Sequence, residues 1–196
     1  MRKYLLIVVL SIWVGVSAGQ SPWKFRSDNY FGFTAGEIGG RGHLQTVNGL
    51  YKGPWFLGLG AGLDYYRYRS VPLFVSVTRD LPAFNSRNGL YLYLDAGINL
   101  PWYYRDLTDF QKYYVISSKF HSGPWGSAGL GYRWRFSSRS DKGLLLSAGY
   151  SVKKLTEKLV GVNSCPSGVC QIQTTTQTYI YDYTNSTLLF LVGFRF

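Results

Sequence analysis

The sequence has few acidic residues and, among its 196 residues, only one methionine, two cysteines and two histidines. Beyond the first nineteen residues it has no run near the ~20 consecutive apolar residues that a membrane-spanning helix needs. That part of the chain can therefore enter a bilayer only as a closed barrel of strands. The scarcity of acids leaves 21 Lys and Arg against 10 Asp and Glu, a net charge of +11.

The positive charge has two explanations. It can belong to ordinary solvated loops and turns, or it can attract the phosphates of outer-membrane lipid and lipopolysaccharide. Nucleic-acid binding is the weakest explanation, because the chain has no Lys/Arg block and no RNP-like motif. We therefore expect lipid partners and no nucleic acid.

The beginning of the chain has the pattern of a cleavable signal peptide. Arg2 and Lys3 precede an apolar run that ends at Val16, and a small-residue cleavage pattern follows. We expect residues 1–19 to be removed on export, which lowers the net charge from +11 to +9. Residues 20–29, with their mixed charges, would then form a short periplasmic lead.

Both cysteines lie close together, at Cys165 and Cys170. In an exported chain this pair predicts a disulfide that closes a small loop. A metal site would need more ligands, and the only histidines, His43 and His121, lie far away in the sequence. We expect no metal and no cofactor.

The chain is rich in residues that favour β-strands, with 18% aromatic residues, 17 of Tyr and 23 of Gly. In its last ten residues every even position is apolar, whereas the odd positions include Gly193 and Arg195. Such a strand fits the closing strand of a barrel, with its apolar face toward lipid and its other face toward the lumen. The lipid-facing residues would be Leu188, Phe190, Val192, Phe194 and Phe196.

Seven further stretches are bounded by turn residues, most of them with the same alternation. Together they predict an all-β fold, an eight-stranded antiparallel up-and-down transmembrane β-barrel over residues 30–196. The predicted strands are 30–39, 43–51, 55–68, 71–79, 89–100, 123–136, 143–158 and 171–196.

The lengths of the connections predict the orientation of this barrel. The connections after the second, fourth and sixth strands are short, whereas 101–122 and 159–170 form two long loops. Outer-membrane barrels have short periplasmic turns and longer extracellular loops. Both termini are therefore expected in the periplasm, and the disulfide on the extracellular side.

The predicted strands carry several short motifs, namely Thr46-Val-Asn-Gly49, Leu57-Gly-Leu-Gly-Ala-Gly-Leu-Asp64, Val71-Pro-Leu-Phe74, Leu94-Asp-Ala-Gly97, Leu130-Gly-Tyr-Arg133, Ala148-Gly-Tyr150 and Gly193-Phe-Arg-Phe196. They resemble the small β-barrel family common in Bacteroidetes outer membranes, of the OmpA/OmpX-like type. Phe194 and Phe196 resemble the C-terminal insertion signal of bacterial outer-membrane barrels. The resemblance implies insertion by the barrel assembly machinery, and it brings no catalytic motif.

Charged residues on the lumen-facing side of the strands are the main polar candidates. A barrel of eight strands is only wide enough for side chains to fill it. We therefore expect a salt-bridge network that satisfies buried charge, with a narrow ion path as the alternative. Its members would be Asp64, Asp95, Arg133, Arg135, Lys153 and Arg195.

The two long loops are the candidates for binding. Aromatic loops above a rigid wall are suited to recognition of glycans, lipid or another envelope protein, although the same residues can simply anchor the barrel. The aromatic candidates are Trp102, Tyr103, Tyr104, Tyr113 and Tyr114.

A lipid A-modifying enzyme is a further alternative, because some eight-stranded barrels of similar size carry Ser/His/acid chemistry. His43, His121 and Ser122 are the only candidates, and consecutive strand residues such as His121 and Ser122 point to opposite faces. We therefore expect no enzyme. The sequence favours an integral outer-membrane barrel with a filled lumen and a structural or surface-binding role.

Overall fold

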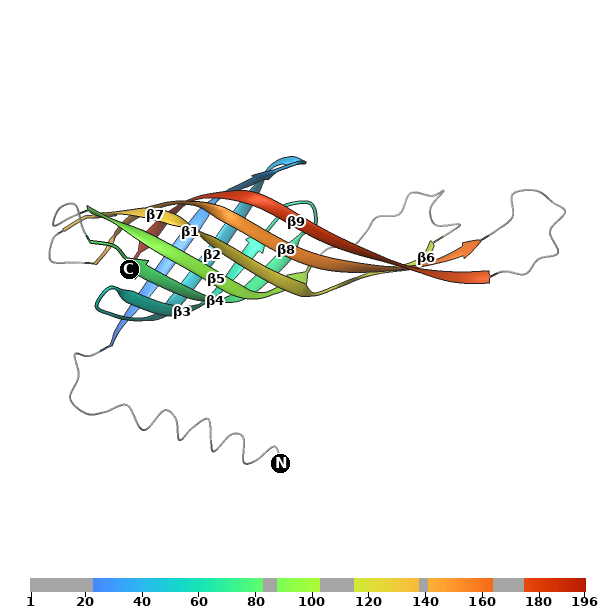
Figure 1. The fold of residues 1–196 in the computed structure, drawn as a ribbon, viewed down its shortest axis with the longest axis horizontal. Coiled ribbons are helices and arrows are strands. Elements are labelled where there is room, and N and C mark those ends of the chain that lie inside the picture. Colours follow the sequence, from blue (N-terminus) through green and yellow to red (C-terminus); the bar gives the residue numbers. More distant parts are fainter. Residues whose placement is uncertain (1–22, 83–87, 103–114, 138–140, 164–174) are drawn as a thin grey trace, which may run out of the picture.

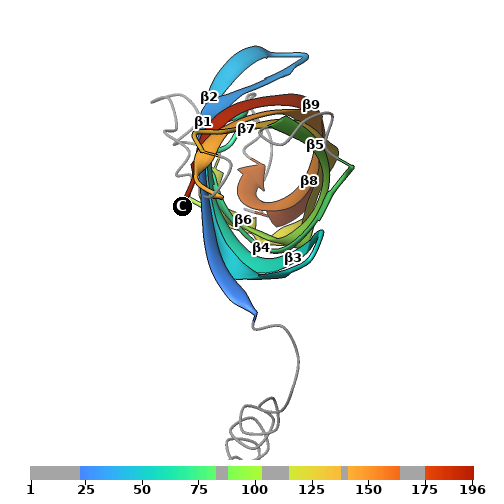
Figure 2. The ribbon, with the colours of Figure 1, turned by 90° about the vertical axis from the view of Figure 1, so that its left-hand side faces the viewer.

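The computed structural model describes residues 23–82, 88–102, 115–137, 141–163 and 175–196, which form nine antiparallel strands. Eight of them close into a ring in the order β1-β2-β3-β4-β5-β7-β8-β9 (Figures 1 and 2). The predicted all-β, eight-stranded barrel is therefore confirmed. The strands are β1 (Lys24–Gly36), β2 (Gly39–Lys52), β3 (Trp55–Asp64), β4 (Ser70–Asp80), β5 (Asn88–Pro101), β6 (Val115–His121), β7 (Gly123–Arg135), β8 (Gly143–Asn163) and β9 (Thr175–Arg195).

The ring closes between its first and last strands. β1 pairs with β9 from Asp28, opposite Arg195, to Ala35, opposite Leu188. β9 pairs on its other side with β8, in one unbroken register along its whole length. Because each ring strand has a neighbour on both sides, the wall has no exposed edge at which another chain could add.

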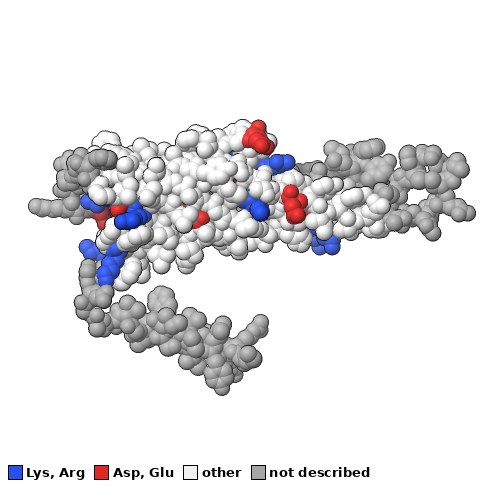
Figure 3. All heavy atoms as spheres, viewed as in Figure 1, with Lys and Arg blue, Asp and Glu red and all other residues white. Residues whose placement is uncertain are grey.

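Side chains along the ring alternate between the outside and the interior, as the sequence predicted. The outside is apolar over the middle of the wall, where the visible face in Figure 3 carries few charges. Within the described ranges, no helix is long and apolar enough to span a membrane. Exposed apolar residues of the wall include Phe31, Phe33, Leu44, Leu57, Leu59, Leu73, Val75, Leu92, Leu94, Leu130, Leu146, Leu188 and Phe190.

The two ends of the barrel differ. At one end, which we call the terminal end, Ser27 and Phe196 exchange two backbone hydrogen bonds of 3.1 and 2.9 Å. The chain therefore starts its first strand and finishes its last one at the same end (Figure 1). The opposite end, which we call the projecting end, carries the longest strand segments.

The projecting end shows a three-stranded extension that the sequence did not predict. β8 pairs with β7 only as far as Lys153, and β9 pairs with β1 only from Leu188 onward. Beyond the ring, β8 and β9 continue as a hairpin, and β6 adds to β8. We call residues 115–121, 154–163 and 175–184 the projecting sheet (Figure 1).

This extension corrects both predicted long loops. The segment 101–122 includes β6, and β8 runs to Asn163 rather than ending at residue 158. The described part of the last strand starts at Thr175, and its predicted start at residue 171 lies outside the described residues. The loops were overestimated because a sheet that projects from a wall needs no apolar outer face, so its polar sequence looks like a loop.

The first strand and its turn also differ from the prediction. β1 starts at Lys24, so most of the predicted lead at 20–29 belongs to the wall. Charged residues made this stretch look like a solvated lead, whereas Arg26 and Asp28 point into the barrel and are buried there. The hairpin after β1 turns at residues 37–38, and Gly39 follows with φ +87°, a backbone conformation that favours glycine.

Candidate functional site

The interior of the ring holds charged side chains in separate groups. The group nearest the projecting end is centred on Lys153, whose Nζ lies 2.8 Å from Asp64 Oδ2. Lys153 also donates to the carbonyl oxygens of Tyr66 and Tyr68, at 2.7 and 3.1 Å. Both charged side chains are at most 5% exposed, so this ion pair is buried.

Asp95 lies deeper inside the ring and has a different environment. Ser127 donates a hydrogen bond of 2.8 Å to Asp95 Oδ2, and Ser76 hydrogen-bonds to the same carboxyl group. Within the described ranges, no cation forms an ion pair with Asp95. It therefore does not join the charge network that the sequence predicted, and its Oδ1 is buried without a geometric hydrogen-bond partner in the described part of the chain.

The remaining predicted charges lie at the terminal end. Arg195 binds Asp28 with two hydrogen bonds of 2.8 and 2.9 Å, and Arg26 lies 3.2 Å from the same carboxyl group. Arg133 pairs with Asp80, whose Oδ1 is 3.8 Å from Arg195 Nη1. At the rim, Arg135 pairs with Asp141 at 3.5 Å. We call Lys24, Arg26, Asp28, Lys52, Asp80, Arg133, Arg135, Asp141 and Arg195 the terminal cluster.

Sequence reasoning missed four members of these ion pairs, one of which is Asp141 in the connection before β8. Arg26 and Asp28 were placed in the lead, and Asp80 was assigned to a turn. The signal that could have located Arg26 and Asp28 is the alternation around Phe25. Extending the predicted first strand backward by six residues, from residue 30, would have placed Arg26 and Asp28 on its inward face.

Apolar side chains fill the lumen between the two charged groups. Val47, Phe56, Phe74 and Trp125 form one buried cluster, and the rings of Phe74 and Trp125 lie 4.7 Å apart. A second cluster contains Tyr91, Tyr93 and Leu145.

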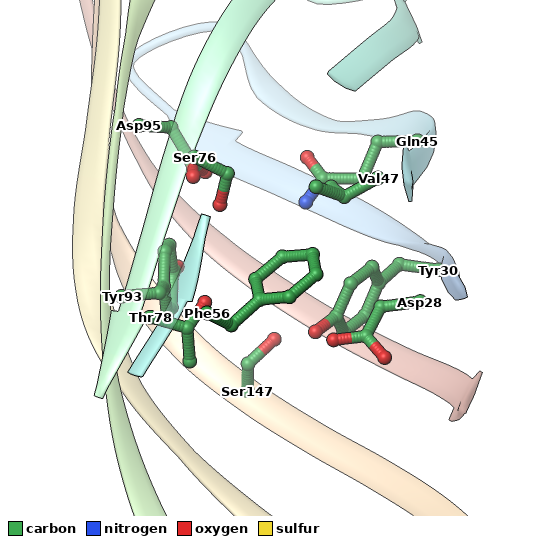
Figure 4. A pocket seen from close by; sticks show the side chains of 10 residues that line it. All are labelled: Asp28, Tyr30, Gln45, Val47, Phe56, Ser76, Thr78, Tyr93, Asp95 and Ser147. Atoms are coloured by element: carbon green, nitrogen blue, oxygen red, sulfur yellow. The ribbon is translucent and has the colours of Figure 1, made fainter. Parts of the chain in front are cut away.

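Around these clusters the remaining space is small. A cavity of about 10 Å³ lies among Tyr30, Phe56 and Tyr93, whose side chains point toward one another in Figure 4. That volume is about the size that one water molecule requires. The lumen is therefore packed rather than open at this level.

The projecting sheet displays a row of aromatic side chains. Tyr179, Tyr181 and Tyr183 alternate along β9, and neighbouring rings stack at 6.5 Å. We call these three residues the tyrosine ladder. Tyr183 is the member nearest the ring of strands, and its side chain packs on Tyr68 with ring centroids 5.1 Å apart. The guanidinium of Arg67 lies 5.3 Å from the centre of the Tyr183 ring.

Glu157 fixes the ladder to the rest of the sheet. Its carboxyl group accepts hydrogen bonds from Ser118 Oγ at 2.6 Å and from the Tyr183 hydroxyl at 2.9 Å, and the residue is fully buried. The sequence could have indicated this residue, because Glu157 follows Lys153 in the inward-facing phase of β8. Tyr179 and Tyr181 are 40% and 46% exposed, so the part of the ladder farther from the ring is accessible.

The predicted loop and terminal residues are only partly covered by the structure. Trp102 lies just after β5 and is 58% exposed. Tyr103, Tyr104, Tyr113 and Tyr114 lie outside the described residues, as do both cysteines (Cys165 and Cys170) and the predicted signal peptide. Phe194 and Phe196 project from the outer wall, 41% and 61% exposed, on the face that the sequence predicted.

Two of the residues considered for catalysis or metal binding lie in different parts of the molecule. His43 is 2% exposed inside the ring, where it hydrogen-bonds to Gln45 at 3.1 Å, and a lipid at the outer wall cannot reach it. His121 ends β6 on the projecting sheet. No group of three or more His, Cys, Asp or Glu residues that could hold a metal ion occurs in the described part of the chain.

Comparisons with known proteins agree with the architecture. No family model and no curated protein matches the sequence. Among solved structures, the chain is similar to the outer membrane protein OprG from Pseudomonas aeruginosa, with 12% identity, a TM-score of 0.55 and coverage of 89% of this chain and 93% of that one. The N-terminal β-barrel domain of OprF from the same organism matches at 10% identity, with a TM-score of 0.46 and coverage of 89% and 100%.

The likeness to OprG is one of fold. It agrees with the expected small outer-membrane type of barrel. It does not distinguish the Bacteroidetes-type or OmpA/OmpX-like barrels that the sequence motifs resemble.

Proposed function

We propose that this protein is an integral barrel of the bacterial outer membrane with a structural or surface-binding role. The apolar outer wall, the absence of an open edge in the ring and the fold shared with OprG, an outer membrane protein, support this proposal. A strand of about 9–11 tilted residues crosses a bilayer. β3 and β4, with 10 and 11 residues, have that length.

In this proposal the terminal end faces the periplasm and the projecting end faces the outside. Residues 53–54, 81–87 and 136–142 connect ring strands at the terminal end, and all three connections are short. The longest segments between ring strands lie at the other end, as in outer-membrane barrels. A signal peptide at residues 1–19 would export the chain, and the C-terminal Phe194 and Phe196 would present it to the barrel assembly machinery.

The observation that carries the proposed role is the filled lumen. The apolar clusters around Phe56 and Tyr91 lie between two groups of ion pairs, and the cavity among them holds about 10 Å³. A hydrated ion has no path of its own size through such packing. The function is therefore assigned to the wall and to the projecting end rather than to conduction.

Binding at the cell surface would use the projecting end. The exposed part of the tyrosine ladder and Trp102 offer flat aromatic faces, which suit glycans, lipopolysaccharide or an envelope protein. Tyr103, Tyr104, Tyr113 and Tyr114 belong to the loop next to this surface in sequence. A disulfide between Cys165 and Cys170 would stiffen the tip of the β8–β9 hairpin.

Planar-bilayer recording tests the filled lumen. We expect the purified mature protein to insert and to stay electrically silent, and an Asp95→Ala variant to stay silent as well. A steady conductance that rises in Asp95→Ala would instead support a narrow ion path through the lumen. Insertion is checked in the same samples by electrophoresis without boiling, in which a folded barrel migrates differently from the boiled protein.

A further inference from the structure

Asp95 is a buried acid in the lumen whose charge is not matched by a cation. The residue is 2% exposed, and it forms no ion pair in the described part of the chain. Other acids of the lumen differ in this respect, because Asp28 pairs with Arg195 and Asp64 pairs with Lys153. An isolated charge is costly to bury, so buried carboxylates are normally paired or bound to a metal ion.

Hydrogen bonds satisfy only part of this carboxyl group. Ser127 donates to Oδ2 at 2.8 Å, and Ser76 hydrogen-bonds to the same carboxyl group. Oδ1 is buried and has no geometric hydrogen-bond partner among the described residues. Two neutral hydroxyl groups stabilise a negative charge but do not cancel it. Asp95 therefore has both a free acceptor atom and a charge that still needs compensation.

The cavity of about 10 Å³ inside the ring borders this group, and Asp95, Ser76 and Gln45 are part of its lining. Figure 4 shows Asp95 and Ser76 on one side of the space, with the amide group of Gln45 pointing toward them from the other side. Thr78 and Ser147 bring further hydroxyl groups to the lining. The volume is about that of one bound water molecule. The cavity therefore offers space for one small particle beside side chains that all carry oxygen.

From this geometry we propose that the cavity beside Asp95 binds one small monovalent cation of about the size of sodium. Hard cations take oxygen ligands, and a cation supplies both a partner for Oδ1 and the missing positive charge. A water molecule could donate a hydrogen bond to Oδ1, but it would leave the charge uncompensated. Calcium takes about six to eight oxygen ligands and carries two charges, whereas Asp28, the other carboxylate of the lining, is already bound by Arg26 and Arg195. The site is compatible with an electrically silent lumen, because an ion that is held there is not conducted.

The dependence of folding on sodium tests this site. The mature protein in phosphatidylcholine vesicles is titrated with urea while sodium chloride replaces choline chloride at constant ionic strength, so that general screening does not change. Choline is too large for the cavity. A cation that binds only the folded protein raises the folding constant by mass action. For a dissociation constant of about 0.1 M or lower, raising sodium from about 30 to about 300 mM should increase the folding constant by about threefold or more.

Three variants separate the site from other effects of sodium. Asp95→Asn keeps the size of the side chain and can still accept a hydrogen bond from Ser127, but it carries no charge, so the sodium dependence should disappear. Ser76→Ala keeps the charge and removes one hydroxyl group beside the cavity, so the dependence should become weaker. The matched control is Glu37→Gln, at an exposed acid in the hairpin after β1. It makes the same change in net charge as Asp95→Asn and should keep the full sodium dependence.

The proposal is overturned if the unchanged protein does not show this rise in sodium, which is the result expected if the Asp95 carboxyl group is protonated or only hydrated. It is also overturned if the sodium dependence persists in Asp95→Asn or is lost in Glu37→Gln, because the cation then binds elsewhere. If Asp95→Asn does not fold, Ser76→Ala decides the question. A sodium dependence in Ser76→Ala equal to that of the unchanged protein would then rule out the site.

Discussion

Replacing Lys153 by methionine should destabilise the barrel strongly. The Lys153 ammonium makes contacts with Asp64, the carbonyls of Tyr66 and Tyr68, and the Ser70 hydroxyl, at 2.7 to 3.4 Å. Methionine fills a similar space but offers no donor. The change therefore leaves a buried carboxylate and two buried carbonyl oxygens without their partner.

The magnitude follows from the burial of the pair. Exposed ion pairs contribute about 0–1 kcal/mol, but here the side chains of Lys153 and Asp64 are only 3% and 5% exposed. Removing one partner of a buried pair typically costs about 3–5 kcal/mol, because an uncompensated charge stays behind. We expect a loss in this range for Lys153→Met. The double variant Lys153→Met, Asp64→Leu should lose less than the sum of its two single changes, because neither charge remains.

Urea titration of the protein in phospholipid vesicles measures the free energy of unfolding, followed by tryptophan fluorescence. The control is Lys154→Met, the next residue on β8, whose exposed side chain lies on the opposite face of the strand. We expect it to stay within about 0.5 kcal/mol of the unchanged protein. The reasoning is refuted if Lys153→Met loses no more stability than this control, or if the double variant is strictly additive.

Three further predictions concern packing, redox state and pH. Gly60→Ala should cost about 1–3 kcal/mol in the same titration, because the added Cβ would lie 2.3 Å from the ring of the buried Phe74; Gly42→Ala, with no atom within 4 Å, should be nearly neutral. Thiol alkylation of protein extracted from the envelope should label neither native cysteine before reduction, and labelling without reductant would contradict the predicted disulfide. Burial alone would raise the pKa of Asp141, but the hydrogen bond from Tyr51 and nearby arginines outweigh it and hold the pKa below its usual range. The Asp141 carboxylate therefore contributes stability above the ordinary pKa of about 4, and this contribution is lost as pH falls through the lower folded value. In Asp141→Asn the folded fraction, measured by electrophoresis without boiling, should depend less on acid pH.

The sequence predicted the wall of the barrel well because the physical constraint there is simple. Each ring strand must turn an apolar side chain outward at every second position, so the alternation of Leu188 to Phe196 or of Leu90 to Leu100 indicates both the strand and its orientation. The ring closure also followed from it, since a terminal strand of this kind needs neighbours on both sides.

The ends of the barrel could not be predicted in the same way. There the outer face no longer has to be apolar, and strands such as β6 lose the signal on which the prediction depended.

The ion pairs could not be predicted without the register between strands. Arg195 pairs with Asp28, 167 positions away, and only the register across the β1–β9 seam brings them together. Alternation shows which charged residues point inward, but not which of them meet.

The closure of the ring between β1 and β9 is the central claim, and a cross-link across this seam tests it most directly. Phe33 and Phe190 face each other there, with ring centroids 5.3 Å apart on the outer wall. With both native cysteines changed to serine, we predict that Phe33→Cys with Phe190→Cys forms a disulfide on oxidation, seen as one linked peptide by mass spectrometry. If no linked peptide forms, while the neighbouring β1–β2 pair Phe31→Cys with Leu44→Cys does cross-link, the ring is not closed as described.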